Sequence, residues 1–305
     1  MSWLSLSVCS AVFLGFYDIA KKTAVHGNAV PPVLLLNVLT SAFLWSPVMI
    51  LSHRDPQSFE NSGFSLLFVD ALSRKEHLLL FAKALLAGSS WIFALFGMKH
   101  LPLSIAAPIR ASSPVWTILI ATVWMHERPS FWQWAGVSIV LFSFYAFSCV
   151  GTREGIQFHR NRWVGFMALA TLLGSFSAIY DKFLLQRMNL TASTVQAWFS
   201  VYLVAVMLPL FIHWYFSGET RDRFFWRWSI PLISVTLLIS DFLYFSALRD
   251  PAAMISLVSP MRRTSIVIPF FVGAYFLREK NWRAKAVCLV ALLTGVYLIS
   301  IAKSS

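Results

Sequence analysis

Ten apolar runs of about 20 residues follow one another along the chain, and they limit what it can fold into. They cover roughly residues 3–25, 30–52, 78–98, 103–125, 131–151, 163–186, 192–216, 228–248, 252–277 and 282–302. A helix of this length crosses the hydrocarbon core of a bilayer, where backbone groups must find their partners inside the protein. We therefore expect an integral, multi-pass, all-α membrane protein with ten transmembrane helices.

The composition agrees with a surface that faces lipid. Of the 305 residues 58% are hydrophobic and 12% are charged, whereas a soluble domain has about 25% charged residues. The net charge of +12 comes from short basic clusters between the apolar runs, as in loops that flank membrane spans, and excludes a nucleic-acid partner. Cys9, Cys149 and Cys288 show no paired spacing, so we expect no disulfide, metal or cofactor.

The second half of the chain repeats a pattern of the first. SIAAPIRASSP and WMHERPSFWQWAGV are followed 152 residues later by SLVSPMRRTSI and FLREKNWRAKAV. Each half holds five spans, an odd number, so the second half enters the membrane inverted. We expect two five-helix repeats (5+5), at 1–151 and 163–303, a symmetry typical of transporters with a binding site near the midplane. The offset of 152 relates Ser104 to Ser256, Pro108 to Pro260, Arg110 to Arg262, Ser113 to Ser265 and Glu127 to Glu279, and an offset of 163 relates Asp18 to Asp181.

These motifs resemble the EamA-type members of the drug/metabolite transporter superfamily. The shared features are proline-centred fourth and ninth spans, each followed by an acid–base pair, a Trp and a span rich in Gly or Ala. His126 and Arg278 stand where the family commonly has Gly. The resemblance implies alternating access around a central cavity, often in amino acid export across a bacterial inner membrane. It also implies a small-molecule substrate and a lipid bilayer as partners, with the chain a monomer or a homodimer.

Two arginines lie within predicted spans, where ionisable groups normally face a bundle interior or water. Arg110 and Arg262 each follow a proline by two residues. We expect their guanidinium groups to enter a shared cavity and bind a carboxylate or phosphate. The alternatives are that they pair with Asp18, Asp181 or Asp241 and lock the bundle, or that they face headgroups.

Intramembrane acids and a lysine extend this candidate site. Asp241 aligns with Ser89 and has no counterpart in the repeat. An unpaired intramembrane carboxylate can carry a proton, so we hypothesise that Asp241, and less firmly Asp181, couple transport to protons. Lys83 either balances Asp241 or contacts the substrate.

Side chains nearer the span ends have simpler interpretations. Asp18 and Lys22 share a helix face at i and i+4, and we expect them to neutralise each other. Lys21 and Lys22 are close enough to the end of the first span to reach the headgroups. Among deeper aromatic residues, Trp91, Tyr180 and Tyr244 are candidates for substrate contact, with core packing as the alternative.

The preferred hypothesis is a secondary transporter, not an enzyme, that exports a small zwitterionic or anionic metabolite such as an amino acid. A polyspecific exporter of apolar cations would instead need free acids in the cavity. A lipid or polyprenyl-carrier flippase would need a lateral opening, and a membrane enzyme a catalytic cluster. The side of the termini stays open, since the positive-inside rule places both outside and the resemblance places both inside.

Overall fold

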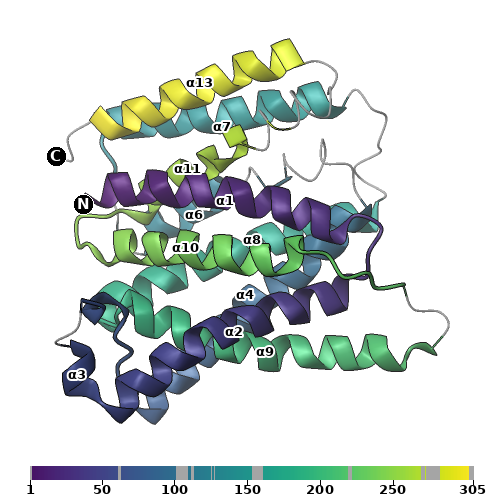
Figure 1. Cartoon of the computed structure of the whole chain (residues 1–305). Coiled ribbons are helices and arrows are strands. Elements are labelled where there is room, and N and C mark those ends of the chain that lie inside the picture. Colours follow the sequence, from purple (N-terminus) through teal and green to yellow (C-terminus); the bar gives the residue numbers. More distant parts are fainter. Residues whose placement is uncertain are drawn as a thin grey trace.

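The structure is a computed structural model of the chain, and it describes most of the 305 residues. The described residues are 2–60, 63–100, 109–110, 113–124, 126, 128–152, 161–218, 222–268, 272 and 282–301. Within these ranges the regular structure is helical, and Figure 1 shows the helices lying side by side as a bundle. The expected all-α membrane fold is confirmed.

Ten of the described helices correspond to the ten expected spans, with ends that differ by a few residues. Six helices are long and apolar enough to cross a membrane, namely α1, α2, α4, α8, α9 and α10. Shorter apolar stretches lie in α7 and α13. The opening of the expected fourth span, 103–108, lies outside the described residues. The helices are α1 (Trp3–Val25), α2 (Val30–Arg54), α4 (Arg74–His100), α6 (Ser113–Trp124), α7 (Phe131–Thr152), α8 (Arg162–Lys182), α9 (Ala192–Phe216), α10 (Ser229–Arg249), α11 (Ile255–Arg263) and α13 (Trp282–Ile301), with the short turns α3 (Pro56–Glu60), η1 (Ser65–Leu67), η3 (Phe183–Arg187) and η5 (Thr264–Ile266).

Local sequence sets where two of these helices begin. At the start of α4 the backbone N–H of Ser73 donates to the Glu76 carboxylate at 2.7 Å, and the N–H of Glu76 donates back to the Ser73 hydroxyl at 3.4 Å. Ser130 and Gln133 make the same reciprocal pair before α7, at 2.8 and 3.4 Å. These capping boxes satisfy backbone donors that a helix start otherwise leaves unpaired.

The connection between α2 and α4 lies at the end of the bundle where α1 begins and α13 ends (Figure 1). Phe64 and Leu66 are 67% and 82% exposed there, as expected of a surface excursion. Asp70 fastens the connection to α9, since its carboxylate accepts hydrogen bonds from the hydroxyls of Thr191 and Thr194 at 2.7 and 2.8 Å.

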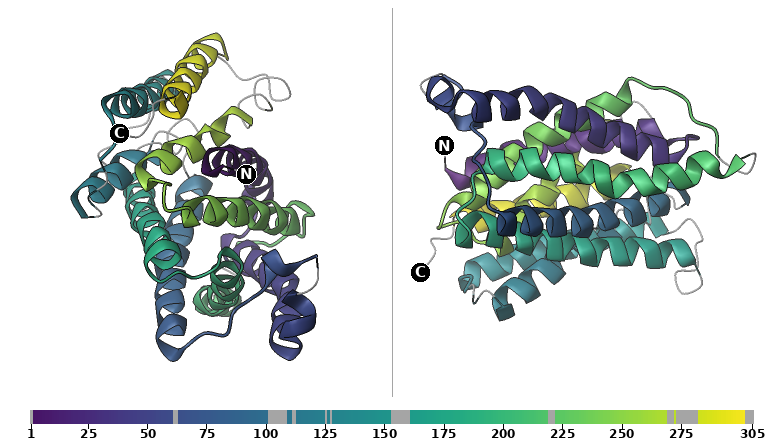
Figure 2. Two further views of the ribbon diagram at one scale, coloured as in Figure 1. Left: turned by 90° about the vertical axis from the view of Figure 1, so that its left-hand side faces the viewer. Right: turned by 90° about the horizontal axis from the view of Figure 1, so that it is seen from below.

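The helices pair in a symmetric pattern: if each helix of the first half is exchanged for its counterpart in the second half, the same set of pairs results. The closest pairs are α1 with α10, α7 with α13, α4 with α8, and α2 with α9, and Figure 2 shows α7 and α13 together at one edge. This exchange turns the pair α1–α10 into the pair α8–α4. It leaves the pairs α2–α9 and α7–α13 as they are. Helices α2 and α9 each have 25 residues, with Pro47 and Pro209 seven residues before the end (54 − 47 and 216 − 209). The inverted repeat itself stays a prediction, which this pairing supports.

Gly295 allows α13 to approach α7 closely. A Cβ atom built there would lie 2.7 Å from Val140 Cγ2 and 2.8 Å from the carbonyl oxygen of Gly136. Because one of these atoms is backbone, the clash cannot be relieved by a side-chain rotation alone.

We therefore expect Gly295→Ala to lower the melting temperature of the purified protein, by the effect of about 1–3 kcal/mol that overpacking usually has. Gly165→Ala is the matched control, because a Cβ there meets nothing within 4 Å and alanine favours the helix. Thermal unfolding in detergent measures both. An unchanged melting temperature for Gly295→Ala would show that α7 and α13 do not touch at this glycine.

Candidate functional site

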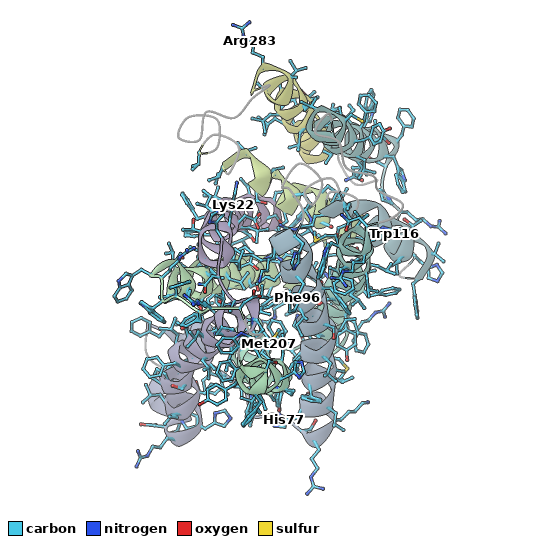
Figure 3. The ribbon with its side chains drawn as sticks, turned by 90° about the vertical axis from the view of Figure 1, so that its right-hand side faces the viewer. Lys22, His77, Phe96, Trp116, Met207 and Arg283 are labelled. Carbon is cyan, nitrogen blue, oxygen red and sulfur yellow. The ribbon has the colours of Figure 1, made fainter. Side chains whose placement is uncertain are left out.

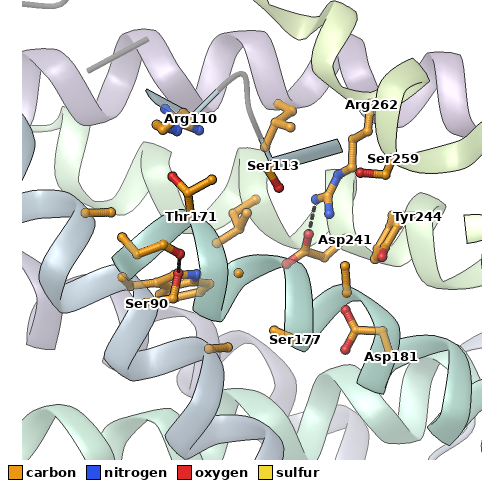
Figure 4. Close-up of a pocket in the computed structure, with 18 of the residues that line it drawn as sticks. Ser90, Arg110, Ser113, Thr171, Ser177, Asp181, Asp241, Tyr244, Ser259 and Arg262 are labelled. Atoms are coloured by element: carbon orange, nitrogen blue, oxygen red, sulfur yellow. Dashed lines mark hydrogen bonds and ion pairs between the residues drawn. The ribbon is translucent and has the colours of Figure 1, made fainter. Parts of the chain in front are cut away.

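A cavity of about 190 Å³ lies inside the bundle, between α1, α4, α8, α10 and α11. Figure 4 shows labelled side chains of α4, α6, α8, α10 and α11, together with Arg110, around this space. For a membrane-embedded chamber the lining is unusually polar. Its charged and hydroxyl-bearing residues are Tyr17, Lys21, Lys83, Ser90, Arg110, Ser113, Thr171, Ser177, Asp181, Asp241, Tyr244, Ser259, Arg262 and Arg263.

Each helix presents one face to the cavity. Along α4 the lining residues are 83, 87, 90, 91 and 94, and along α8 they are 170, 171, 174, 177, 178 and 181. These spacings of three and four place side chains on one side of a helix. The polar residues of otherwise apolar spans are therefore gathered toward one space.

Three ion pairs join different helices around this space. Arg262 of α11 pairs with Asp241 of α10, and Lys83 of α4 pairs with Asp181 of α8. Arg110 reaches Asp18 of α1, with 3.3 Å between Nη1 and Oδ1. In a low dielectric each partner would be costly alone, so these pairs hold the helices in register across the cavity.

Aromatic rings cover two of the paired cations. The Arg262 guanidinium lies 4.2 Å from the centroid of the Tyr244 ring. The Lys83 ammonium lies 4.3 Å from the Phe199 ring and 4.8 Å from the Phe245 ring, and the side chain is only 2% exposed. Cation–π contacts of this kind are strongest where water is excluded, and they favour the positive charge at both positions.

A layer of buried apolar side chains adjoins the cavity. Leu80, Leu184, Leu248 and Ile255 are buried there with Phe245, and they come from helix ends at the side where α1 begins. Phe245 also lines the cavity, so the layer lies directly beside the charged chamber.

The structure brings together most of the residues singled out from the sequence. Tyr180 is the exception, because its hydroxyl donates to the carbonyl oxygen of Leu79 at 3.2 Å and its ring packs against Phe183, outside the cavity lining. The predicted residues that line the cavity are Lys83, Trp91, Arg110, Asp181, Asp241, Tyr244 and Arg262.

Several expected pairings differ from those observed. Asp241 is not unpaired, since Arg262 neutralises it, and the partner of Lys83 is Asp181 rather than Asp241. Asp18 pairs with Arg110 instead of its helix neighbour Lys22, which is exposed. Arg110 and Arg262 each line the cavity and each form an ion pair, with Asp18 and Asp241 respectively. Their binding of an anionic substrate group stays a prediction.

Two cavity cations were missed by sequence reasoning. Lys21 was expected to reach the headgroups, but it is 5% exposed and lines the cavity. The helical spacing of Leu14, Tyr17 and Lys21 (i, i+3, i+7) was the available signal. Arg263 was not singled out beside Arg262, although both line the cavity, because adjacent helical residues ordinarily face different directions.

Other sequence expectations fall on parts that the structure leaves undescribed. Ser104, Pro108, Glu127 and Glu279 all lie outside the described residues. Within the described ranges His, Cys, Asp and Glu side chains form no group that could hold a metal ion. The groups that the cavity offers to a solute are Arg, Lys, Asp and hydroxyl side chains.

The Lys83–Asp181 pair gives a direct test of this geometry. Lys83→Met leaves the carboxylate of Asp181 buried without its partner, and breaking a buried pair in this way costs about 3–5 kcal/mol. We expect a much lower melting temperature for Lys83→Met, and recovery of most of the loss in Lys83→Met/Asp181→Leu. If the double variant were as unstable as the single one, the ion pair would not be what Lys83 contributes.

Comparisons with known proteins agree with this fold. A solved structure described only as "Crystal structure of protein" has a TM-score of 0.68 and 14% sequence identity, covering 98% of this chain and 96% of that one, which indicates a shared fold. No curated protein matches the chain. Residues 1–149 match the EamA-like transporter family. The chain belongs to this family of the drug/metabolite transporter superfamily and is an integral, multi-pass membrane transporter.

Proposed function

We propose that this chain is a secondary transporter of a small anionic or zwitterionic metabolite, such as an amino acid, working by alternating access. The observation that carries the proposal is the charge of the cavity lining. Five cationic side chains line it, against two carboxylates, Asp181 and Asp241. A cavity of about 190 Å³ suits a small metabolite rather than a drug-sized molecule.

The balance of charge in the cavity argues against the alternative function, export of apolar cations. An exporter of apolar cations needs acidic groups that are free to receive the substrate. Among the described residues that line the cavity, both acids are occupied: Asp241 is paired with Arg262, and Asp181 with Lys83. Anionic groups, by contrast, meet guanidinium forks that bind carboxylate bidentately.

Alternating access has a physical basis in the same contacts. The ion pairs connect α4 to α8 and α10 to α11, and the apolar layer lies toward the end where α1 begins. We propose that two inverted halves, 1–151 and 163–303, rock about this site, with the symmetric helix pairing as support. Export and a bacterial inner membrane belong to the proposal and rest on the family resemblance.

Neutralising Arg262 tests the anionic substrate. In proteoliposomes, Arg262→Gln should reduce uptake of a transported amino acid by about 10- to 100-fold, the worth of one charge-assisted hydrogen bond. The double variant Arg262→Gln/Asp241→Asn controls for the broken ion pair, since it removes both charges. It should transport as poorly as Arg262→Gln, but it should be more stable than that single variant. Strong thermal stabilisation by tetraphenylphosphonium, with no response to amino acids in either protein, would favour the cation exporter instead.

Proton coupling through Asp241 is a separate part of the proposal. Because Arg262 holds this carboxylate, Asp241 exchanges a proton only after the pair opens, which an arriving anionic group on Arg262 would cause. Asp181 is held by Lys83 in the same way.

Asp241→Asn should therefore flatten the pH dependence of transport, measured as initial rates between about pH 5.5 and 8.5, the range in which coupled carriers are usually compared. Asp222→Asn is the matched control, because Asp222 is also ion-paired, to Lys99, but is 60% exposed and lies outside the cavity. The same rate and the same pH profile in Asp241→Asn as in the wild type would remove Asp241 from coupling.

A further inference from the structure

The cations of the cavity outnumber their acidic partners. Lys83, Arg262 and Arg110 each have a carboxylate, as described above. Lys21 and Arg263 have none among the residues that the structure describes. Among the described residues, five cations therefore share three carboxylates, Asp18, Asp181 and Asp241, so the positive charges exceed the negative ones by two.

Lys21 is held inside rather than turned to the lipid surface. Its side chain is 5% exposed, and its ammonium lies 5.2 Å from the centroid of the Tyr17 ring, one turn earlier on α1. A ring face is a weak substitute for a carboxylate. Lys22, the next residue, is exposed, so the burial of Lys21 is particular to its helix face.

Among the described residues, the hydrogen-bond partner of Arg263 is a neutral hydroxyl. Its Nη2 donates to the Ser113 hydroxyl at 3.0 Å, and that hydroxyl lies 3.1 Å from the hydroxyl of Ser175. A guanidinium has five N–H donors in a planar fork, so one hydroxyl leaves most of them available. Neither serine carries a charge that could balance the arginine.

The unbalanced cations lie in one region, together with Arg110. The charges of Arg110 and Arg263 both act on Lys21, and the charge of Arg110 acts on Arg263. Asp18, the ion-pair partner of Arg110, also acts on both Lys21 and Arg263, so one carboxylate is shared by three cations. The close packing of α1 on the turn after α11 brings them together: a Cβ at Gly15 would lie 2.9 Å from the carbonyl oxygen of Ser265.

We propose that Lys21, Arg110 and Arg263 form a subsite for one doubly charged oxyanion group, either the phosphate of a phosphate monoester or a compact dicarboxylate. The inference rests on the proposed function and specifies its substrate class. A dianion balances both excess positive charges. A monoanion leaves one of them unbalanced, and a zwitterion such as glycine leaves the net charge of the cavity unchanged. Charge uncompensated inside a membrane protein is unfavourable, so the cavity selects by charge as well as by shape.

Matched ligands test the charge selection directly. Methyl phosphate is mostly a dianion at pH 7.5, and dimethyl phosphate is a monoanion with a similar shape; succinate and butyrate form the corresponding carboxylate pair. Binding to purified wild-type protein, measured by isothermal titration, should favour at least one dianion over its monoanion by about tenfold or more. If the preference is shown by methyl phosphate, the subsite binds a phosphate monoester. If it is shown by succinate, the subsite binds a dicarboxylate.

Two variants assign the selection to residues. Lys21→Met and Arg263→Gln should each reduce the preference to within about threefold, whereas Lys22→Gln and Arg283→Gln should retain it. Both control residues are exposed, and Figure 3 shows Arg283 pointing away from the bundle. Lys21→Met should also raise the melting temperature of the ligand-free protein, the opposite of Lys83→Met, because it removes a charge without a partner.

Several results would overturn the inference: equal binding of dianions and monoanions by the wild type, an undiminished preference in both variants, or a lower melting temperature for Lys21→Met. If monoanions bind as tightly as dianions and Arg262→Gln weakens both, the proposed function stands and only the dianion subsite is wrong. If no anion or zwitterion binds and tetraphenylphosphonium does, both are wrong.

Discussion

The need to neutralise charge inside a low-dielectric bundle decides how this protein is built. The cavity ion pairs join separate helices: α4 to α8 through Lys83 and Asp181, which are 98 residues apart, and the consecutive helices α10 and α11 through Asp241 and Arg262. Packing alone would leave the relative rotation of apolar helices weakly defined, since lipid competes equally for their surfaces. The pairs fix these rotations, and the polar chamber follows from them.

The same pairs suit a carrier better than a rigid scaffold would. A buried ion pair adds little net stability, because the desolvation of both charges offsets most of their attraction. In the proposed transport cycle an anionic substrate can therefore replace Asp241 beside Arg262 at a small cost in free energy. The Lys83–Asp181 pair is drier, 2% and 8% exposed, and is flanked by two phenylalanine rings. We therefore expect it to stay closed while the more accessible pair exchanges.

The sequence predicted the helices well and the partners of the charges poorly. Spans are encoded locally by runs of apolar residues, so α1, α2 and α9 begin where the runs do. Which residues face the cavity follows from helical spacing, as in α4 and α8, and most candidate site residues line it. Pairing depends instead on which helices become neighbours. The expectation of an Asp18–Lys22 pair considered one helix alone, whereas Arg110 arrives from another.

The predicted repeat shows where the site departs from symmetry. Arg110 corresponds to Arg262 and Asp18 to Asp181, so the Arg110–Asp18 pair implies an Arg262–Asp181 pair in the second half. That pair does not form, because Asp181 and Arg262 each have another partner. The new partners are side chains whose counterparts in the repeat carry no charge: Lys83, which corresponds to Val235, and Asp241, which corresponds to Ser89. One added cation and one added anion leave the total charge unchanged while making the two halves unlike. In the proposed transport cycle a substrate meets two unlike pairs, Arg262–Asp241 at 19% and 12% exposed and Lys83–Asp181 at 2% and 8% exposed. We expect this difference to set the orientation in which the substrate binds.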